Sequence, residues 1–255
     1  VGFALLDVLS RASGPLMLRD LAASAGMSAA KAHRYLVSFQ RLGLVAQDSQ
    51  STRYDLGPAA LRVGLSALER VDAVRLGRAA MPALLEQAGH TVALAVWGNH
   101  GPTIIHWEET PLAAPVNLRL GDVMPLLSSA TGQCFAAFAK PSLDDCLVKI
   151  EPLLREELAR ARKLGRRDVP TTEADYLALL QQVRQRGLAR VVDTLLPGIA
   201  GFCAPVFDAD GHLALGVVVL GSGATLDVEW DGQIAGPLKA TAERLSTELG
   251  YTGRR

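Results

Sequence analysis

The chain has 255 residues, 49% of them apolar, and carries 26 basic and 26 acidic side chains. This length suits one large or two small domains with real hydrophobic cores. The zero formal charge gives no argument for nucleic acid from the chain as a whole. Residues 1–62, however, hold seven basic and four acidic side chains. A basic excess on one small domain is compatible with phosphate contact.

Cysteine usage and hydropathy indicate the cellular compartment in which the protein works. The three cysteines, Cys134, Cys146 and Cys203, form no CxxC pair. Their odd number and spacing argue against a disulfide framework or a structural zinc site and favour a reducing cytoplasm. We find no apolar run of membrane-spanning length and no signal peptide. The sequence therefore predicts a cytoplasmic protein with no membrane contact.

The first third of the chain predicts three helices. Residues 4–10 have helical spacing, and a short helix follows over residues 18–25. Gly26 then makes a tight turn, and Ser28 is a plausible N-cap. In the next helix, residues 29–42, apolar side chains recur at three- and four-residue steps and define a buried stripe, namely Ala32, Tyr35, Leu36, Phe39 and Leu42.

A β-hairpin completes this domain. Residues 44–47 and 53–56 are strand-like and flank a polar turn at residues 48–52. Helix, glycine turn, amphipathic helix and hairpin form a winged helix-turn-helix, which we assign to residues 1–60. Such a motif places its second helix in the major groove of DNA.

The outer face of the third helix carries Lys31, Arg34, Ser38 and Arg41, with His33 toward its edge. Arg and Lys match guanine O6 and N7, and alanine methyls can touch thymine methyls. Arg53, on the wing, is well placed for a phosphate. The predicted contacts to double-stranded operator DNA are Ser28, Ala29, Ala30, Lys31, His33, Arg34 and Arg53.

The pattern after the wing predicts a linker helix and a second domain. The helical pattern runs from Pro58 to about Arg75, and we assign residues 61–75 as the linker. Residues 76–255 form the second domain, which opens and closes with helices over residues 76–88 and 231–249. Between them we expect a helix at 129–139, mostly helical chain at 142–186, and strands at 91–97, 103–107, 116–120, 189–193, 202–208 and 213–220. Antiparallel hairpins flanked by helices favour an α+β fold over a doubly wound parallel sheet.

Six stretches of the sequence are informative when taken together: Leu21–Ser28, His33–Leu36, Leu42–Val45, Tyr54–Gly57, Leu120–Leu126 and Ser129–Gln133. They resemble the IclR family of bacterial transcriptional regulators. The resemblance implies a winged helix-turn-helix, a linker helix and a GAF-like effector-binding domain. It also implies homodimers, often paired into tetramers, with repression as the default and activation also common. Ser28 and Lys31 stand where the family usually has Pro and Thr, so the operator sequence does not transfer.

An effector pocket is expected in the second domain. Residues 129–132 open a helix, whose unpaired N–H groups suit a carboxylate. The resemblance adds a loop and strands, so the predicted lining is Ser129, Ala130, Thr131, Gly132, Asp193, Gly201, Cys203, Val218 and Leu220. Because Val218 and Leu220 are apolar, we expect the effector to be a small aromatic or alkyl carboxylate. We expect the regulated genes to form a catabolic operon.

Structural roles compete with this assignment. Cys203 can be a small buried hydrophobe, Asp193 can cap a turn, and Ser129 can simply cap its helix. The second domain can also be a dimerisation scaffold without a ligand, or hold a metal through a cysteine and one of His90, His100, His106 and His212, although none has ligand-like spacing. No esterase, zincin or Walker motif is present. We therefore predict no catalytic residues, no metal site and no cofactor.

Overall fold

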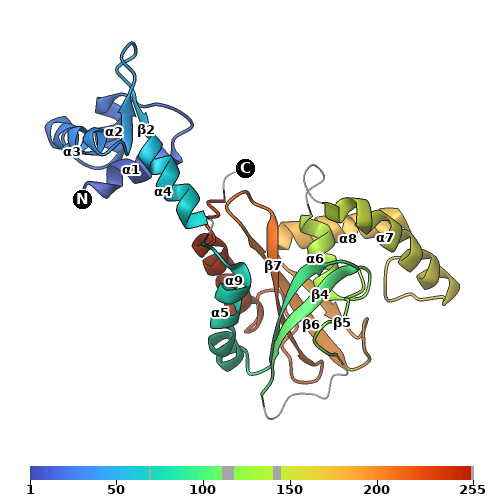
Figure 1. The fold of residues 1–255 in the computed structure, drawn as a ribbon. Helices are drawn as coiled ribbons and strands as arrows, with labels where there is room; N and C mark the ends of the chain where they lie inside the picture. Colours follow the sequence, from blue (N-terminus) through green and yellow to red (C-terminus); the bar gives the residue numbers. More distant parts are fainter. Residues whose placement is uncertain (69, 111–117, 140–144, 254–255) are drawn as a thin grey trace. The chain divides into compact units, whose positions relative to one another are not determined.

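The structure is a computed structural model that describes residues 1–68, 70–110, 118–139 and 145–253. The chain divides into two units, Val1–Val71 and Asp72–Arg255, and Figure 1 shows their elements. Each unit has its own hydrophobic core. Among the described residues, no helix combines the length and the apolar character needed to cross a membrane.

The first unit is a winged helix-turn-helix. Its elements are α1 (Phe3–Arg11), α2 (Leu18–Ser24), α3 (Ala29–Arg41), β1 (Val45–Gln47), β2 (Tyr54–Leu56) and α4 (Pro58–Leu68). The strands pair antiparallel, with Val45 opposite Leu56. Leu16 adds an isolated bridge to Tyr54, which ties the wing to the chain before α2. The core consists of Leu5, Leu9, Leu21, Ala22, Ala32, Leu36, Val45 and Tyr54.

The buried stripe of α3 follows the predicted spacing with one exception. Ala32 and Leu36 are buried, and Tyr35 and Phe39 are half-buried. Leu42, predicted to be buried, is 65% exposed. The helix ends at Arg41 and Leu42 is its C-cap, so its side chain leaves the stripe.

The predicted helix from Pro58 to Arg75 is wrong in its second half. Helix α4 ends at Leu68, and a separate helix, α5 (Ala73–Ala88), begins five residues later. The Asp72 carboxylate accepts a hydrogen bond from the Arg75 backbone N–H at 3.0 Å and caps this new helix. Such a side-chain cap satisfies a free N–H group at a helix start, so it separates two helices that have similar apolar periodicity.

The second unit contains a five-stranded antiparallel sheet. Its strands are β3 (Thr91–Gly98), β4 (Gly101–Glu108), β5 (Ala189–Val192), β6 (Ile199–Phe207) and β7 (Leu213–Ser222), in the order β4-β3-β7-β6-β5. Every pairing in that order is antiparallel. The predicted α+β class, with a winged helix-turn-helix followed by an antiparallel-sheet domain, is confirmed.

Helices cover both faces of this sheet (Figure 1). Helices α5 and α9 (Ala235–Glu248) pack on one face, while α6 (Ala130–Phe138), α7 (Asp145–Lys163) and α8 (Glu173–Arg186) lie on the other. Alternation along the strands supplies both cores: Ala93 and Ala95 face the α6 side, and Val92 and Leu94 face the α5 side. The closing helix begins at Ala235, four residues after its predicted start.

The strand predicted at residues 116–120 is a further error. Residues 116 and 117 lie outside the described residues, and Leu118–Leu120 have no strand structure. The chain instead turns between Arg119 and Asp122, because the Asp122 carboxylate accepts the Arg119 N–H at 2.8 Å and Gly121 adopts a φ of 92°. A positive φ of this kind departs from the extended backbone of a strand and is favoured in turns.

Replacing Gly57 by alanine should destabilise the first unit. An alanine Cβ at position 57 would lie 2.3 Å from the carbonyl oxygen of Gly43, a backbone atom. Overpacking of this kind costs about 1–3 kcal/mol. Hydrogen–deuterium exchange of peptides from residues 1–68 should therefore accelerate in Gly57→Ala. Gly64→Ala is the matched control, since its Cβ meets no atom within 4 Å; equal exchange in both variants would contradict the prediction.

Candidate functional site

The N-terminal turn of α3 presents a compact polar surface. The Ser28 hydroxyl caps the helix by accepting the Lys31 backbone N–H at 3.4 Å. The opposite face holds Ala32 and Leu36 in the core, so the cap and stripe together direct the remaining side chains outward. All six predicted contact residues on this helix are exposed: Ser28, Ala29, Ala30, Lys31, His33 and Arg34.

The wing is held in shape by its own turn. The Asp48 carboxylate accepts hydrogen bonds from the Gln50 and Ser51 N–H groups and the Ser51 hydroxyl. These bonds, those from Ser51 first, lower the pKa of Asp48. Arg53 is exposed, and its guanidinium donates a hydrogen bond to the Pro15 carbonyl oxygen at 3.1 Å. Arg53 thus has a structural contact in addition to its predicted phosphate contact.

Six of the nine predicted effector residues border one small cavity in the second unit. These are Ser129, Ala130, Thr131, Gly201, Val218 and Leu220. The cavity has a volume of about 40 Å³, and its other walls are Leu118, Met124, Val191, Leu195, Leu196, Ile199 and Ala200. Its lining is mostly apolar, with the first turn of α6 at one end. We call it the α6 cavity.

The other three predicted residues have different positions. Asp193 is exposed, has a φ of 58°, and accepts the Gly198 N–H at 2.7 Å, so it closes a turn. Cys203 is fully buried in the apolar core and does not border the α6 cavity. Gly132 also lies off its lining, yet it permits a close contact: a Cβ there would be 2.0 Å from the Pro125 carbonyl oxygen.

The segment 124–128, of which Met124 borders this cavity, is fastened to α6. The Ser129 hydroxyl accepts the Gly132 N–H at 2.8 Å and donates to the Pro125 carbonyl oxygen at 2.6 Å. Both hydrogen-bonding functions of this hydroxyl are therefore used within the protein. At the start of an α-helix the first N–H groups have no partner inside the helix, so those of Ala130 and Thr131 are the groups left to meet a carboxylate.

Sequence reasoning missed Glu157, which holds the same segment from α7. Its two carboxylate oxygens accept the backbone N–H groups of Leu126 and Leu127, each at 2.9 Å. Burial raises the pKa of Glu157, while these two hydrogen bonds oppose the rise. Glu157 lies about thirty residues away in sequence and belongs to no motif. The one signal that could have indicated it is a carboxylate on the buried face of the amphipathic helix α7.

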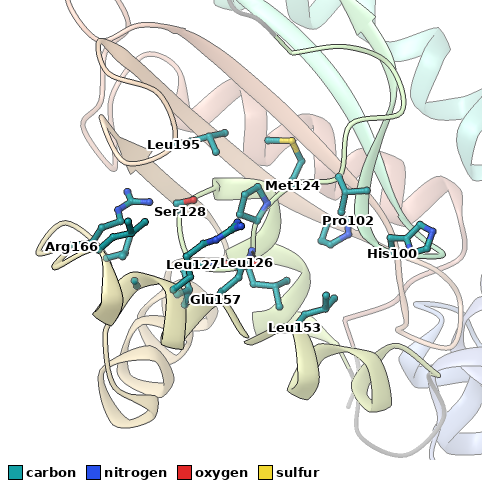
Figure 2. A pocket seen from close by; sticks show the side chains of 16 residues that line it. His100, Pro102, Met124, Leu126, Leu127, Ser128, Leu153, Glu157, Arg166 and Leu195 are labelled. Atoms are coloured by element: carbon teal, nitrogen blue, oxygen red, sulfur yellow. Dashed lines mark hydrogen bonds between the residues drawn. The ribbon is translucent and has the colours of Figure 1, made fainter. Parts of the chain in front are cut away.

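A second, larger cavity lies on the Glu157 side of this segment (Figure 2). Its volume is about 330 Å³. Apolar side chains such as Leu126, Leu153 and Val169 line it together with Glu157 and Arg166. Arg166 is already engaged, because its guanidinium bonds Asp168 and the Thr194 carbonyl oxygen. We call this space the α7 cavity.

Neither a thiol nucleophile nor a metal site gains support from the geometry. Cys134 is fully buried next to Cys203, and burial raises the pKa of its thiol, which disfavours the nucleophilic thiolate. In the part of the chain that the structure describes, Asp208, Asp210 and His212 form the group of potential metal ligands. It contains no cysteine, and the Asp208 carboxylate accepts the N–H groups of Asp210 and His212, as expected for a hairpin turn.

Comparison with known families agrees with this architecture. The IclR helix-turn-helix domain matches residues 1–49, and the bacterial transcriptional regulator IclR C-terminal domain matches residues 65–247. The second match alone covers more than half of the chain. The chain belongs to the IclR family. It is accordingly a DNA-binding transcriptional regulator and not an enzyme.

Individual IclR-type relatives match along nearly the whole length. The glycerol operon regulatory protein of Streptomyces coelicolor is 29% identical, over 97% of this chain and 94% of its own. The DNA-binding transcriptional repressor YiaJ of Escherichia coli is 26% identical, over 99% and 88%. The crystal structure of Pseudomonas aeruginosa HmgR superposes with a TM-score of 0.87 at 37% identity, covering 99% of this chain and 98% of that one.

Removing the Glu157 carboxylate should destabilise the second unit. Glu157→Ala leaves the Leu126 and Leu127 N–H groups without their acceptor. An unpaired buried N–H costs about 1–3 kcal/mol, so we expect a loss of about 2 kcal/mol or more in the free energy of unfolding. Thermal unfolding should show a fall of about 4–8 °C. Glu156→Ala, at an exposed position on the same helix, is the control, and an equal fall in that variant would refute a specific role for Glu157.

Proposed function

We propose that the exposed N-terminal turn of α3 reads the major groove of a double-stranded DNA operator. The observation that carries this proposal is the joint exposure of the six α3 residues above a buried stripe. Lys31 and Arg34 would donate to guanine edges, while Ala29 and Ala30 would meet thymine methyls. Ser28 and His33 lie beside them on this surface. Arg53 would contact a phosphate from the wing.

The regulator would act as a repressor of a catabolic operon. Two relatives support this reading by name, a glycerol operon regulatory protein and a DNA-binding transcriptional repressor. In the proposed switch, residues 61–75 link a DNA-binding domain of residues 1–60 to an effector-binding domain of residues 76–255. Effector binding would change the spacing of two recognition helices in a dimer, which must match half-sites separated by whole turns of DNA.

A homodimer, or a dimer of dimers, would form the operator-binding species. Exposed apolar side chains on α4 support an association of this kind: Leu61 and Val63 are each 64% exposed, and Leu65 is 51% exposed. Exposed apolar surface of this extent often marks a protein–protein contact. Half-site pairing would also supply the specificity that a small basic excess on one domain cannot provide.

The effector would be a small organic acid with an aromatic or alkyl body. Its carboxylate would lie at the first turn of α6, where the Ala130 and Thr131 N–H groups and the positive end of the helix favour an anion. Ser129 shapes this turn as its cap. The apolar body of the effector would face Val218 and Leu220. In the sheet register Gly201 lies opposite Leu220. Apolar walls with few polar anchors are typical of small-molecule sites.

Arg34→Ala should weaken operator binding by about ten- to a hundredfold, because one side-chain contact to a base is worth about 1–3 kcal/mol. Gel-shift or anisotropy titration of the adjacent promoter DNA would measure the change. Arg155→Ala is a charge-matched control in the second unit, where Arg155 is exposed and paired with Glu151. If operator affinity is unchanged in Arg34→Ala, the recognition face is misplaced.

Thermal unfolding of the full chain should respond to organic acids. A ligand present at a hundred times its Kd adds about 2.7 kcal/mol to the stability of the native state. We expect stabilisation by aromatic and alkyl monocarboxylates and titratable binding by calorimetry. Binding of small hydrophilic acids alone would exclude the predicted ligand class. No stabilisation by any acid would favour a second unit that is only a dimerisation scaffold.

A further inference from the structure

The α6 cavity and the α7 cavity share two wall residues. Met124 and Leu195 each border both spaces. Figure 2 labels both side chains among those that line the α7 cavity. The two cavities are therefore neighbours at these two side chains, and the backbone of the segment 124–128 lines the α7 cavity.

That backbone is held along its length. The segment makes hydrogen bonds to β4, α6, α7 and the loop after β5: Met124 N–H to Pro102, Pro125 carbonyl to Ser129, Leu126 and Leu127 N–H to Glu157, Leu127 carbonyl to Gln133, and Ser128 carbonyl to Thr194. Moving it would break several buried or partly buried hydrogen bonds, each costly to leave unmade. The partition can open cheaply only through its side chains.

Met124 is suited to that role. Its backbone N–H is anchored on the Pro102 carbonyl oxygen at 2.7 Å, and its side chain is buried between the two spaces. A methionine side chain is unbranched, with three rotatable bonds, and adapts to irregular gaps. Rotation of this chain would join the cavities without disturbing the hydrogen bonds of the segment.

The volumes of the two cavities indicate that an aromatic carboxylate needs both of them. An engineered cavity that binds benzene has a volume of about 150 Å³, whereas the α6 cavity has about 40 Å³. The α7 cavity, at about 330 Å³, falls within the range of about 300–1,000 Å³ usual for small-molecule sites. A carboxylate with a phenyl ring cannot be accommodated by the smaller space alone.

We propose that the effector chamber extends past Met124 and Leu195 into the α7 cavity, which takes the apolar body of an arylalkyl carboxylate. This inference rests on the proposed effector site at the first turn of α6. Met124 and Leu195 then set the size of ligand that the regulator accepts. Ala161, a buried residue of α7 that lines the larger cavity, limits how far the ligand body can extend.

The test compares a long and a short acid by titration calorimetry on the full chain. The probes are 3-phenylpropionate and propionate, and the variants are Ala161→Leu, which fills the α7 cavity, and Ala159→Leu, a control at an exposed position on the same helix. We expect Ala161→Leu to weaken 3-phenylpropionate binding by about tenfold or more while propionate binding stays unchanged. Ala159→Leu should bind both acids as the wild type does.

Met124→Ala provides a second variant, expected to bind 3-phenylpropionate several-fold more tightly because the partition is gone. Wild-type affinity for 3-phenylpropionate in a folded Ala161→Leu would overturn the extended chamber. If Ala161→Leu does not fold, wild-type affinity in Met124→Ala overturns it instead. Binding of propionate but not 3-phenylpropionate to the wild type overturns the chamber and leaves the proposed effector site standing. Failure of both acids overturns the effector site and the chamber together.

Discussion

The close packing of the Pro125 backbone on the first turn of α6 is the constraint on which the arrangement around both cavities of the second unit depends. A side chain at position 132 would place its Cβ 2.0 Å from the Pro125 carbonyl oxygen. Glycine there lets the segment 124–128 lie against the helix, and the Ser129 hydroxyl bonds both partners. The first turn of α6 borders the α6 cavity, and the segment 124–128 forms a wall of the α7 cavity.

Distant parts of the chain converge on the same wall. Glu157 comes from α7, Gln133 from α6 and Thr194 from the loop after β5, and each bonds the backbone between Leu126 and Ser128. Burial makes an unpaired polar group costly, and one atom of this group, Gln133 Oε1, is buried without a hydrogen-bond partner among the described residues. A ligand that altered one of these contacts would therefore affect three elements at once.

Local patterns were sufficient for the elements whose signals are continuous in the chain. The apolar steps of α3, the Gly26 turn and the wing predicted the DNA-binding unit, and antiparallel hairpins flanked by helices predicted the α+β class of the second unit. Errors arose where a single side chain overrides periodicity. Asp72 starts a new helix within an apparently continuous pattern, and Asp122 with Gly121 turns a segment that resembles a strand.

The sequence by itself determined the family, the fold class and the six cavity-lining residues that belong to recognisable segments or strands. Only the tertiary structure decided that Asp193 closes a turn and that Cys203 packs in the core instead of lining the cavity. It also revealed Glu157, Met124 and Leu195 as parts of one wall. The physical reason is separation along the chain: these side chains meet only after α7 and the β5–β6 loop pack on the segment 124–128. No local spacing records a contact made at that range.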